Sequence, residues 1–457
     1  MKRALCLALA AVLLTALPTL AKVTLPDVQE FKLDNRLTVR VAERHDLPLF
    51  SMQLVFHAGS SHDPAGRDGL AAISNEMLMR GTPDRTAQQI AEEVAFVGGT
   101  FSNFCARASA GFSGEFLTAK GETGFIILGD ILSNSLLAPE EFDKVKTRQL
   151  ASIQNSLEDP STVASNKFYE TVWQGSRFAH PTEGSTESVE SLTRDDMVAY
   201  LKDYYTPDNA VLVVCGDITP SQIRDWATQH LGSWQGTSEV AVSDKEFPPT
   251  RGKKVVLYDK PDATQTQIRI GATAFPLGHP DMWPYEVART IYGGSFTSRL
   301  MNEIRVNRGL SYGVRCYSTQ YPAGGLVYVS TFTKNATVGE VLDIILNESA
   351  RMQTEPIPDS EYVGAINYRC GLYPLNYETS DDIVGTLSNM WLYDLDKSYY
   401  ENYQENLRAT RPADAMDIAR KYFPGDDFVL VLVGNAEEVK PQVEKYGELT
   451  VIPLSSQ

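Results

Sequence analysis

Two distant segments of the chain share one pattern of apolar and polar positions. Residues 193–217, TRDDMVAYLKDYYTPDNAVLVVCGD, predict a helix, a Pro/Asp turn, an uninterrupted apolar strand and a glycine. Residues 410–435, TRPADAMDIARKYFPGDDFVLVLVGN, repeat that order. Pro207 and Pro424 occupy the same place in the two copies, 217 residues apart. The spacing indicates an internal duplication.

The segments that precede each copy also correspond in order. Strand-like runs at 37–42 (LTVRVA) and 51–59 (SMQLVFHAG) have counterparts at 254–259 (KVVLYD) and 266–274 (TQIRIGATA), and a helix-rich stretch follows each pair. The pattern predicts an α+β fold of two tandem duplicated domains, each an antiparallel β-sheet packed with helices.

The N-terminus has the pattern of a secretory signal, because Lys2 and Arg3 precede an apolar run and a small-residue site ending at Ala21. We therefore expect an exported, periplasmic protein. No later apolar run is long enough to predict a membrane span. The predicted organisation is a signal peptide (1–21), an N-terminal domain (22–240), a polar, proline-containing linker (241–252) and a C-terminal domain (253–457).

Charge and composition narrow the range of partners. The formal charge is −17, and −19 once Lys2 and Arg3 leave with the signal. Such an acidic chain is not expected to bind nucleic acid or anionic lipid, whereas cationic peptides are compatible with it. The four cysteines after the signal are scattered without a C-x-x-C pair, which argues against a cysteine metal site.

Residues 69–82, GLAAISNEMLMRGT, predict a helix over 69–80 with an apolar stripe that ends at Gly81. The order of strand, HAGSSHDPAGRDGLA, helix and Arg-Gly-Thr resembles the pitrilysin (insulinase-like, inverzincin) zinc metallopeptidase family, in its short two-domain type. Members of that family have H-x-x-E-H on this helix. Two histidines four residues apart share a helix face and ligate zinc, and the glutamate acts as base on the zinc-bound water.

The zinc motif is degenerate in this sequence. The resemblance places Ala72 and Glu76 where the histidines would stand and Asn75 where the catalytic glutamate would stand. The family's remaining ligand is a glutamate on a later helix, and its place falls within residues 150–153, which contain no carboxylate. We therefore expect no metal ligands and no bound cofactor in this chain.

Residues 293–314, GGSFTSRLMNEIRVNRGLSYGV, predict a glycine turn, a helix capped by Ser295 or Thr297, a left-handed end at Gly309 and a strand from about Ser311. This segment resembles the family's carboxyl-terminal domain, in which an arginine and a tyrosine seven residues apart assist catalysis.

Arg305 and Tyr312 match that pair. Both can donate hydrogen bonds to a substrate carbonyl oxygen on which negative charge develops. A purely structural reading also exists, since an arginine suits the last turn of a helix and tyrosines often open strands. Weaker substrate-binding candidates are Arg308 and Asn103, the latter in a segment (98–103) that resembles the edge strand with which substrates pair in active members.

Some members of the family divide the zinc site and the Arg/Tyr pair between two chains. The resemblance therefore implies the non-zinc subunit of a periplasmic heterodimeric metallopeptidase, which would act on peptides beside a homologous zinc-bearing partner. The alternative is a non-catalytic peptide-binding or scaffold protein that uses the same two-domain clamshell. An active peptidase with an unrelated site is the weakest hypothesis.

Overall fold

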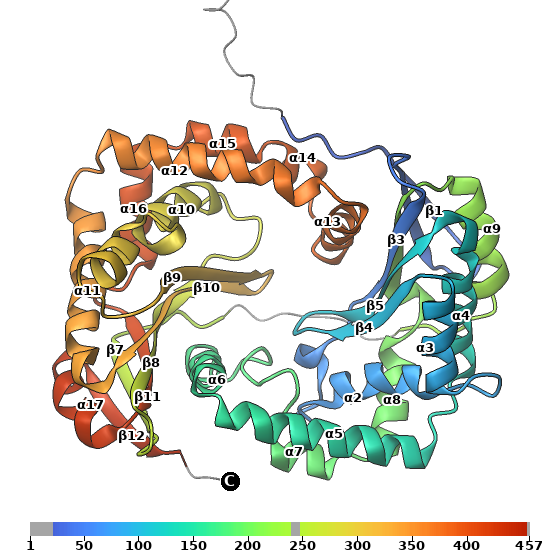
Figure 1. The fold of residues 1–457 in the computed structure, drawn as a ribbon, viewed down its shortest axis with the longest axis horizontal. Helices are drawn as coiled ribbons and strands as arrows, with labels where there is room; N and C mark the ends of the chain where they lie inside the picture. The colour runs from blue at the N-terminus through green and yellow to red at the C-terminus, as the bar shows by residue number, and fades with distance from the viewer. Residues whose placement is uncertain (1–21, 239–246, 455–457) are drawn as a thin grey trace, which may run out of the picture.

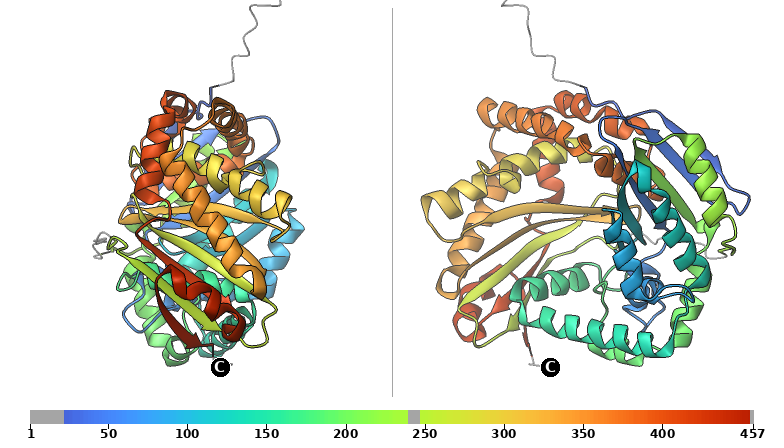
Figure 2. Two further views of the ribbon diagram at one scale, coloured as in Figure 1. Left: turned by 90° about the vertical axis from the view of Figure 1, so that its left-hand side faces the viewer. Right: turned by 45° about the vertical axis from the view of Figure 1, so that its right-hand side comes forward.

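The computed structural model describes residues 22–238 and 247–454. The predicted signal peptide and residues 241–246 of the predicted linker lie outside these ranges. The first half (22–238) and the second half (247–454) each contain one six-stranded sheet, and the two sheets face each other across the molecule (Figure 1). Figure 2 shows that the molecule is narrower from the side than from the front.

The sheet of the first half has the order β1-β2-β6-β3-β5-β4. Its strands are β1 (Val28–Lys32), β2 (Thr38–Glu43), β3 (Leu49–Phe56), β4 (Thr100–Cys105), β5 (Ala110–Leu117) and β6 (Ala210–Gly216). The sheet of the second half has the order β12-β7-β11-β8-β10-β9. Its strands are β7 (Lys253–Asp259), β8 (Gln265–Ala274), β9 (Val314–Tyr321), β10 (Gly324–Lys334), β11 (Phe428–Gly434) and β12 (Glu448–Pro453).

Five strands of each sheet correspond in order, which confirms the predicted duplication and the α+β fold class. The sheets are mixed, however, rather than antiparallel throughout. The apolar strands β6 and β11 run parallel to β2 and β7 and antiparallel to β3 and β8. Each helix-turn-strand unit therefore inserts its strand into the middle of the sheet. The local apolar pattern does not specify whether that strand runs parallel or antiparallel to its neighbours.

Most helices lie on the outer side of the sheets, whereas α6 and α13 lie between the two sheets (Figure 1). The helices of the first half are α2 (Leu70–Met77), α3 (Ala87–Phe96), α4 (Glu122–Asn134), α5 (Pro139–Glu158), α6 (Pro160–Val172), α7 (Thr186–Ser191), α8 (Arg194–Tyr204) and α9 (Pro220–Leu231). Those of the second half are α10 (Met282–Arg289), α11 (Val338–Thr354), α12 (Asp359–Leu372), α13 (Ser380–Leu392), α14 (Lys397–Glu401), α15 (Tyr403–Ala409), α16 (Pro412–Tyr422) and α17 (Ala436–Val443).

Two helices cross between the halves. Phe168 on the buried face of α6 and Trp173, directly after that helix, pack with apolar residues of β7 and β11 in one core cluster. In return α13 packs Ile383 and Leu387 against Val213 and its neighbours on the first sheet. Figure 1 shows both helices between the two sheets. Each half thus completes the apolar core of the other, so the two halves form one interdependent structure.

Two further features of the structure concern the cysteines and the length of the helices. Cys105, Cys215, Cys316 and Cys370 are all free thiols, and the last three are buried. In the ranges that the structure describes, we find no helix with the length and apolar character required to cross a bilayer.

Candidate functional site

The helix with the degenerate motif forms nearly as predicted. α2 spans Leu70–Met77 and continues as a short 3₁₀ turn to Arg80. Gly69 adopts a left-handed conformation (φ 94°) before it. The Asp63 carboxylate accepts hydrogen bonds from the amides of Gly69 (2.8 Å) and Ala71 (2.7 Å), which satisfies donors at the helix N-terminus. Burial raises the pKa of Asp63 well above its usual value.

Asn75, at the position of the catalytic glutamate, is fully buried. Its amide nitrogen donates to the hydroxyl of Tyr205 (2.9 Å) and to the carbonyl of Gly111 (3.4 Å). Its amide oxygen accepts from the side chain of Asn103 (2.7 Å). The side chain is therefore a structural bridge between α2 and the edge strand β4, with no proton to accept or release at neutral pH.

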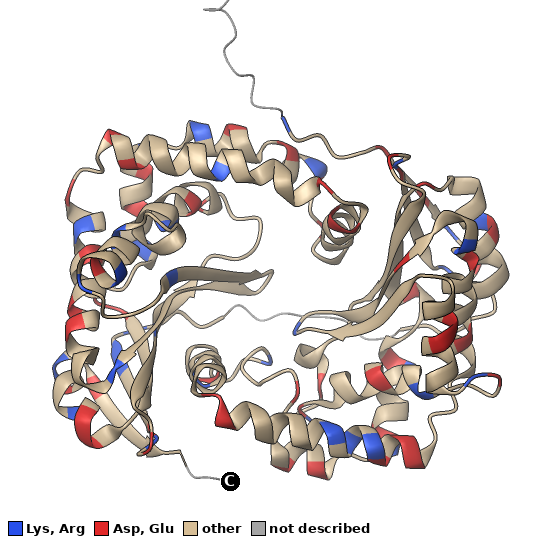
Figure 3. Cartoon of the chain, in the orientation of Figure 1, with Lys and Arg blue, Asp and Glu red and all other residues tan. Residues whose placement is uncertain are grey.

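Glu76 is the one carboxylate left at the motif positions, and two guanidinium groups surround it. Its Oε1 forms an ion pair with Arg80, one helical turn later, and another with Arg148 of α5 at 2.8 Å. Figure 3 shows several basic positions along α5, the helix that supplies Arg148. Two positive charges beside Glu76 oppose a divalent cation.

The helix that would supply the last ligand, α5, has no carboxylate at the expected place, residues 150–153. Directly before these residues, Gln149 donates its amide hydrogens to the carbonyls of Gly69 (3.0 Å) and Glu183 (2.7 Å). Ala72 offers only a methyl group. An alanine, an amide and a doubly ion-paired carboxylate do not fit a zinc ion, which needs three or four nitrogen, sulfur or oxygen ligands. The described residues contain no cluster of three or more His, Cys, Asp or Glu side chains placed to hold a metal.

The structure brings Arg305 and Tyr312 together. The guanidinium carbon of Arg305 lies 4.6 Å from the centre of the Tyr312 ring and 4.7 Å from that of the Phe296 ring. Both rings are exposed, Tyr312 by 77% and Phe296 by 57%. The cation–π contacts orient the arginine while the hydroxyl of Tyr312 stays accessible to a ligand.

The backbone around this pair differs from the prediction. The helix that contains Arg305 begins near Ser298, whose hydroxyl accepts from the Met301 amide (3.4 Å), so the predicted caps at Ser295 and Thr297 were wrong. Ser295 instead donates to the carbonyl of Thr290 (3.2 Å).

The remainder of the segment is close to the prediction. Met301–Asn307 is π-helical, a wider winding that local propensity does not predict. Gly309 ends the helix at φ 62°, as predicted. The strand β9 begins at Val314, three residues later than expected.

The weaker candidates differ in their surroundings. Arg308 forms ion pairs with Glu340 (3.1 Å) and Glu303 (3.7 Å), so existing carboxylates already occupy its guanidinium. Asn103 lies on β4, an edge strand, and is bonded to Asn75. Arg308 therefore belongs to a surface ion-pair group, whereas Asn103 is close to the degenerate motif.

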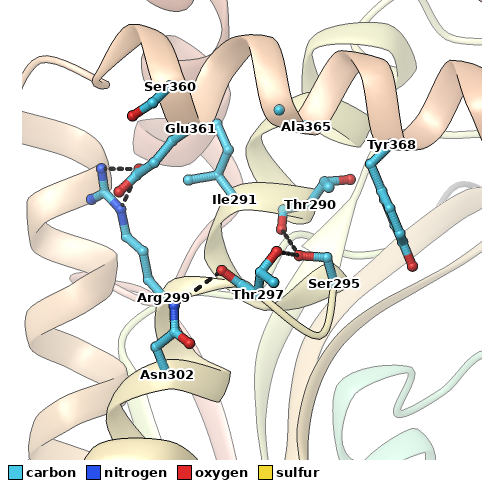
Figure 4. Close-up of a pocket in the computed structure, with 11 residues that line it drawn as sticks. Thr290, Ile291, Ser295, Thr297, Arg299, Asn302, Ser360, Glu361, Ala365 and Tyr368 are labelled. Atoms are coloured by element: carbon cyan, nitrogen blue, oxygen red, sulfur yellow. Dashed lines mark hydrogen bonds and ion pairs between the residues drawn. The ribbon is translucent and has the colours of Figure 1, made fainter.

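A pocket of about 280 Å³ lies next to the Arg305 helix, between it and α12 (Figure 4). Arg299, Asn302, Glu361 and Tyr368 are among its lining residues. Arg299 is already paired with Glu361, through Nε at 2.9 Å and Nη2 at 2.8 Å. The pocket is therefore polar but internally neutralised.

Sequence reasoning missed three residues of these sites. Arg80 could have been found, because it stands four residues after Glu76 on the same helix face. Arg148 could not, since nothing in the sequence shows that α5 lies beside α2. Phe296 also gave no signal, because its contact with Arg305 depends on the turn at 295–298.

Two family models match the chain. "Insulinase (Peptidase family M16)" matches residues 40–186, which include α2, and "Peptidase M16 inactive domain" matches residues 191–368, which include Arg305 and Tyr312.

Among curated relatives, an uncharacterized zinc protease of Rickettsia felis is 25% identical over 335 residues, 73% of this chain and 80% of that protein. An uncharacterized zinc protease of Bacillus subtilis is 24% identical over 376 residues, 82% of this chain and 90% of that protein. The mitochondrial-processing peptidase subunit beta of Mus musculus is 24% identical over 355 residues, 75% of this chain and 71% of that protein.

Solved structures show the same fold. The peptidase M16 inactive domain from Pseudomonas fluorescens superposes with a TM-score of 0.83 at 24% identity, and the match covers 90% of this chain and 98% of that one. A protease from Helicobacter pylori gives a TM-score of 0.83 at 16% identity, with 90% and 100% covered.

Proposed function

The chain belongs to the insulinase (M16) peptidase family, and we propose that it is the non-zinc subunit of a heterodimeric metallopeptidase. One combination of observations supports this role. The residues on α2 and α5 do not fit zinc, whereas Arg305 and Tyr312 are present, in contact and accessible. A chain that hydrolysed peptides alone would need the zinc site on α2 and α5. A scaffold would have no use for the Arg305/Tyr312 pair.

In this role Arg305 and Tyr312 bind and orient the substrate. The guanidinium and the phenol hydroxyl would donate hydrogen bonds to a carbonyl oxygen of a bound peptide. Because charge grows on that oxygen as water attacks, the donors stabilise the transition state more than the ground state. The zinc, with the base that activates water, would belong to a homologous partner protein.

The proposed location of the complex is the periplasm. The proposal rests on the signal-like residues 1–21, with Lys2 and Arg3 before the apolar run. Extended peptides are the proposed substrates, since the edge strand β4 has a neighbour on one side only and its other edge is open to strand addition.

Affinity purification of the tagged protein from its native cells tests the proposal. The expected result is a second protein in about equal amount, with an intact H-x-x-E-H and bound zinc, and peptide hydrolysis by the pair that neither subunit shows alone. Recovery of the tagged protein by itself, or as a homodimer, would overturn the heterodimer and favour a peptide-binding protein.

A further inference from the structure

A second polar pocket, of about 310 Å³, lies in the first half. It lies where the turn after β4, the junction of α5 and α6, and the loop before α7 meet. Its lining residues are Arg107, Ser152, Ser156, Thr162, Asn166, Thr182 and Glu183. None of them belongs to the Arg305/Tyr312 site or to the motif positions on α2, although Ser152 lies within the stretch 150–153 where the family's last zinc ligand would stand.

Arg107 is held firmly from three sides. Its carbonyl accepts from the Ser61 amide (2.8 Å), its Nε donates to the Phe178 carbonyl (3.1 Å), and its guanidinium carbon lies 4.5 Å from the centre of the Tyr169 ring. Among the described residues, neither terminal nitrogen of Arg107 has a hydrogen-bond or ion-pair partner. The fork is thus fixed in place while most of its donors are unused.

Other polar groups in the pocket are also available. The hydroxyls of Ser152 and Thr182 and the side-chain amide of Asn166 make no hydrogen bond to another group in the part of the protein that the structure describes. The one carboxylate in the lining is Glu183, which is solvent-exposed and forms no ion pair with Arg107. The contrast with Arg299, which Glu361 already neutralises, identifies Arg107 as the open cationic group.

A carboxylate matches these donors. A guanidinium fork binds the two oxygens of a carboxylate, and the hydroxyls and amide can donate to the remaining lone pairs. The place of the pocket along the fold points to a peptide as the source. Arg107 stands two residues after the end of β4, so a peptide added to the open edge of that strand would reach the pocket with one end.

We propose that this pocket binds a carboxylate of a peptide that extends along β4, either the peptide's own C-terminal carboxylate or an acidic side group. Arg107 supplies the charge, and Asn166, Ser152 and Thr182 complete the hydrogen bonds. The inference rests on the proposed function only in taking peptides as ligands. The pocket would select substrates that have an anionic group, although the protein as a whole is acidic.

The test measures dissociation constants of the purified protein for three peptides of one sequence, by isothermal titration. One has a free C-terminus and no acidic residue, the second is its C-terminal amide, and the third is the amide with one glutamate near its end. The free acid or the glutamate peptide should bind roughly 10- to 100-fold more tightly than the plain amide, as expected for a charged hydrogen-bonded pair. Which of the two binds tightly identifies the source of the carboxylate.

Two variants assign the effect to the pocket. Arg107→Gln should abolish the preference for the carboxylate peptide. Asn166→Asp, which keeps the shape and adds a negative charge, should do the same without touching the Tyr169 contact. The control variant Arg420→Gln removes a surface arginine that is paired with Asp417, and it should retain the preference for the carboxylate peptide.

Equal affinity for all three peptides, absence of binding, or a preference that survives both pocket variants would overturn the assignment. None of these results bears on co-purification of a zinc-bearing partner. Conversely, failure to find a partner leaves the peptide preference as a separate observation.

Discussion

Asn103 of the edge strand β4 donates its amide hydrogen to Asn75 of α2 at 2.7 Å. In the family's zinc motif, the position of Asn75 belongs to the glutamate that activates water. Here a neutral amide connects the helix to the strand and also bonds to the buried Tyr205 hydroxyl (2.9 Å). The former catalytic position therefore stabilises the fold, because each polar group in this buried network is a partner of another.

The network predicts a stability cost for Asn75→Ala. The substitution would leave the Tyr205 hydroxyl and the Asn103 amide without partners and would open a cavity, so we expect the free energy of unfolding to fall by about 2 kcal/mol or more. Urea unfolding followed by circular dichroism would measure it. Asn367→Ala, at an exposed position on α12, is the matched control and should change stability by less than about 0.5 kcal/mol. Equal effects of the two changes would contradict the structural role.

Patterns along the sequence predicted the elements better than their contacts. The repeated helix-turn-strand unit and the strands that precede it were enough to predict two duplicated domains, each with a sheet, and the apolar runs of that unit are the strands β6 and β11, which are buried at every position. The exchange of α6 and α13 could not be predicted, since an apolar helix face does not specify which sheet it covers. The ion pair of Glu76 with Arg148 was missed for the same reason, as it joins residues 72 positions apart.

The exchanged helices predict that neither half folds alone. Produced separately, residues 22–238 and 247–457 would each expose an apolar sheet face that α13 or α6 covers in the whole protein. We expect each to aggregate or to unfold without cooperativity, and the two together to give one cooperative thermal transition. Calorimetry and size-exclusion chromatography would show this.

A point variant tests the same contact within the whole protein. Phe168 is fully buried in the cluster that joins α6 to the second sheet. Phe168→Ala should cost about 3–5 kcal/mol of unfolding free energy in a single transition. Two well-separated transitions in the parent protein would contradict the interdependence of the halves.

His57 predicts a loss of stability in mild acid. Its ring lies 4.2 Å from that of Trp391, at the contact between the first sheet and α13, and burial lowers its pKa below the ordinary value of 6.5. The unfolded protein then binds the proton more tightly than the folded one. The stability from neutral His57 is thus complete above pH 6.5 and is lost as pH falls through the lowered pKa.

Unfolding free energies at about pH 7.5 and pH 5 would measure this effect, which should be smaller in His57→Gln than in the parent protein. His45 gives the opposite sign, because hydrogen bonds to Asp217 and Glu43 raise its pKa. His45→Gln should therefore enlarge the fall in stability between the two pH values. An unchanged pH dependence in His57→Gln would show that the Trp391 contact does not control it.

Arg305 and Tyr312 give the prediction most specific to the proposed role, once the zinc-bearing partner is in hand. Arg305→Ala removes a charged donor, and Tyr312→Phe removes only a hydroxyl, from a site where both groups meet. Loss of one such donor typically costs about 3 kcal/mol of transition-state stabilisation, so kcat of the pair should fall roughly 100-fold in either variant, with a smaller change in KM.

The controls for these two variants separate catalysis from assembly. Zinc content and association with the partner should stay unchanged, because neither residue binds the metal and Tyr312 is largely exposed. Arg420→Ala, which removes a distant arginine paired with Asp417, should keep full activity. If both site variants hydrolyse peptides at the parent rate, the pair has no part in catalysis and the contact between Arg305 and Tyr312 serves the fold alone.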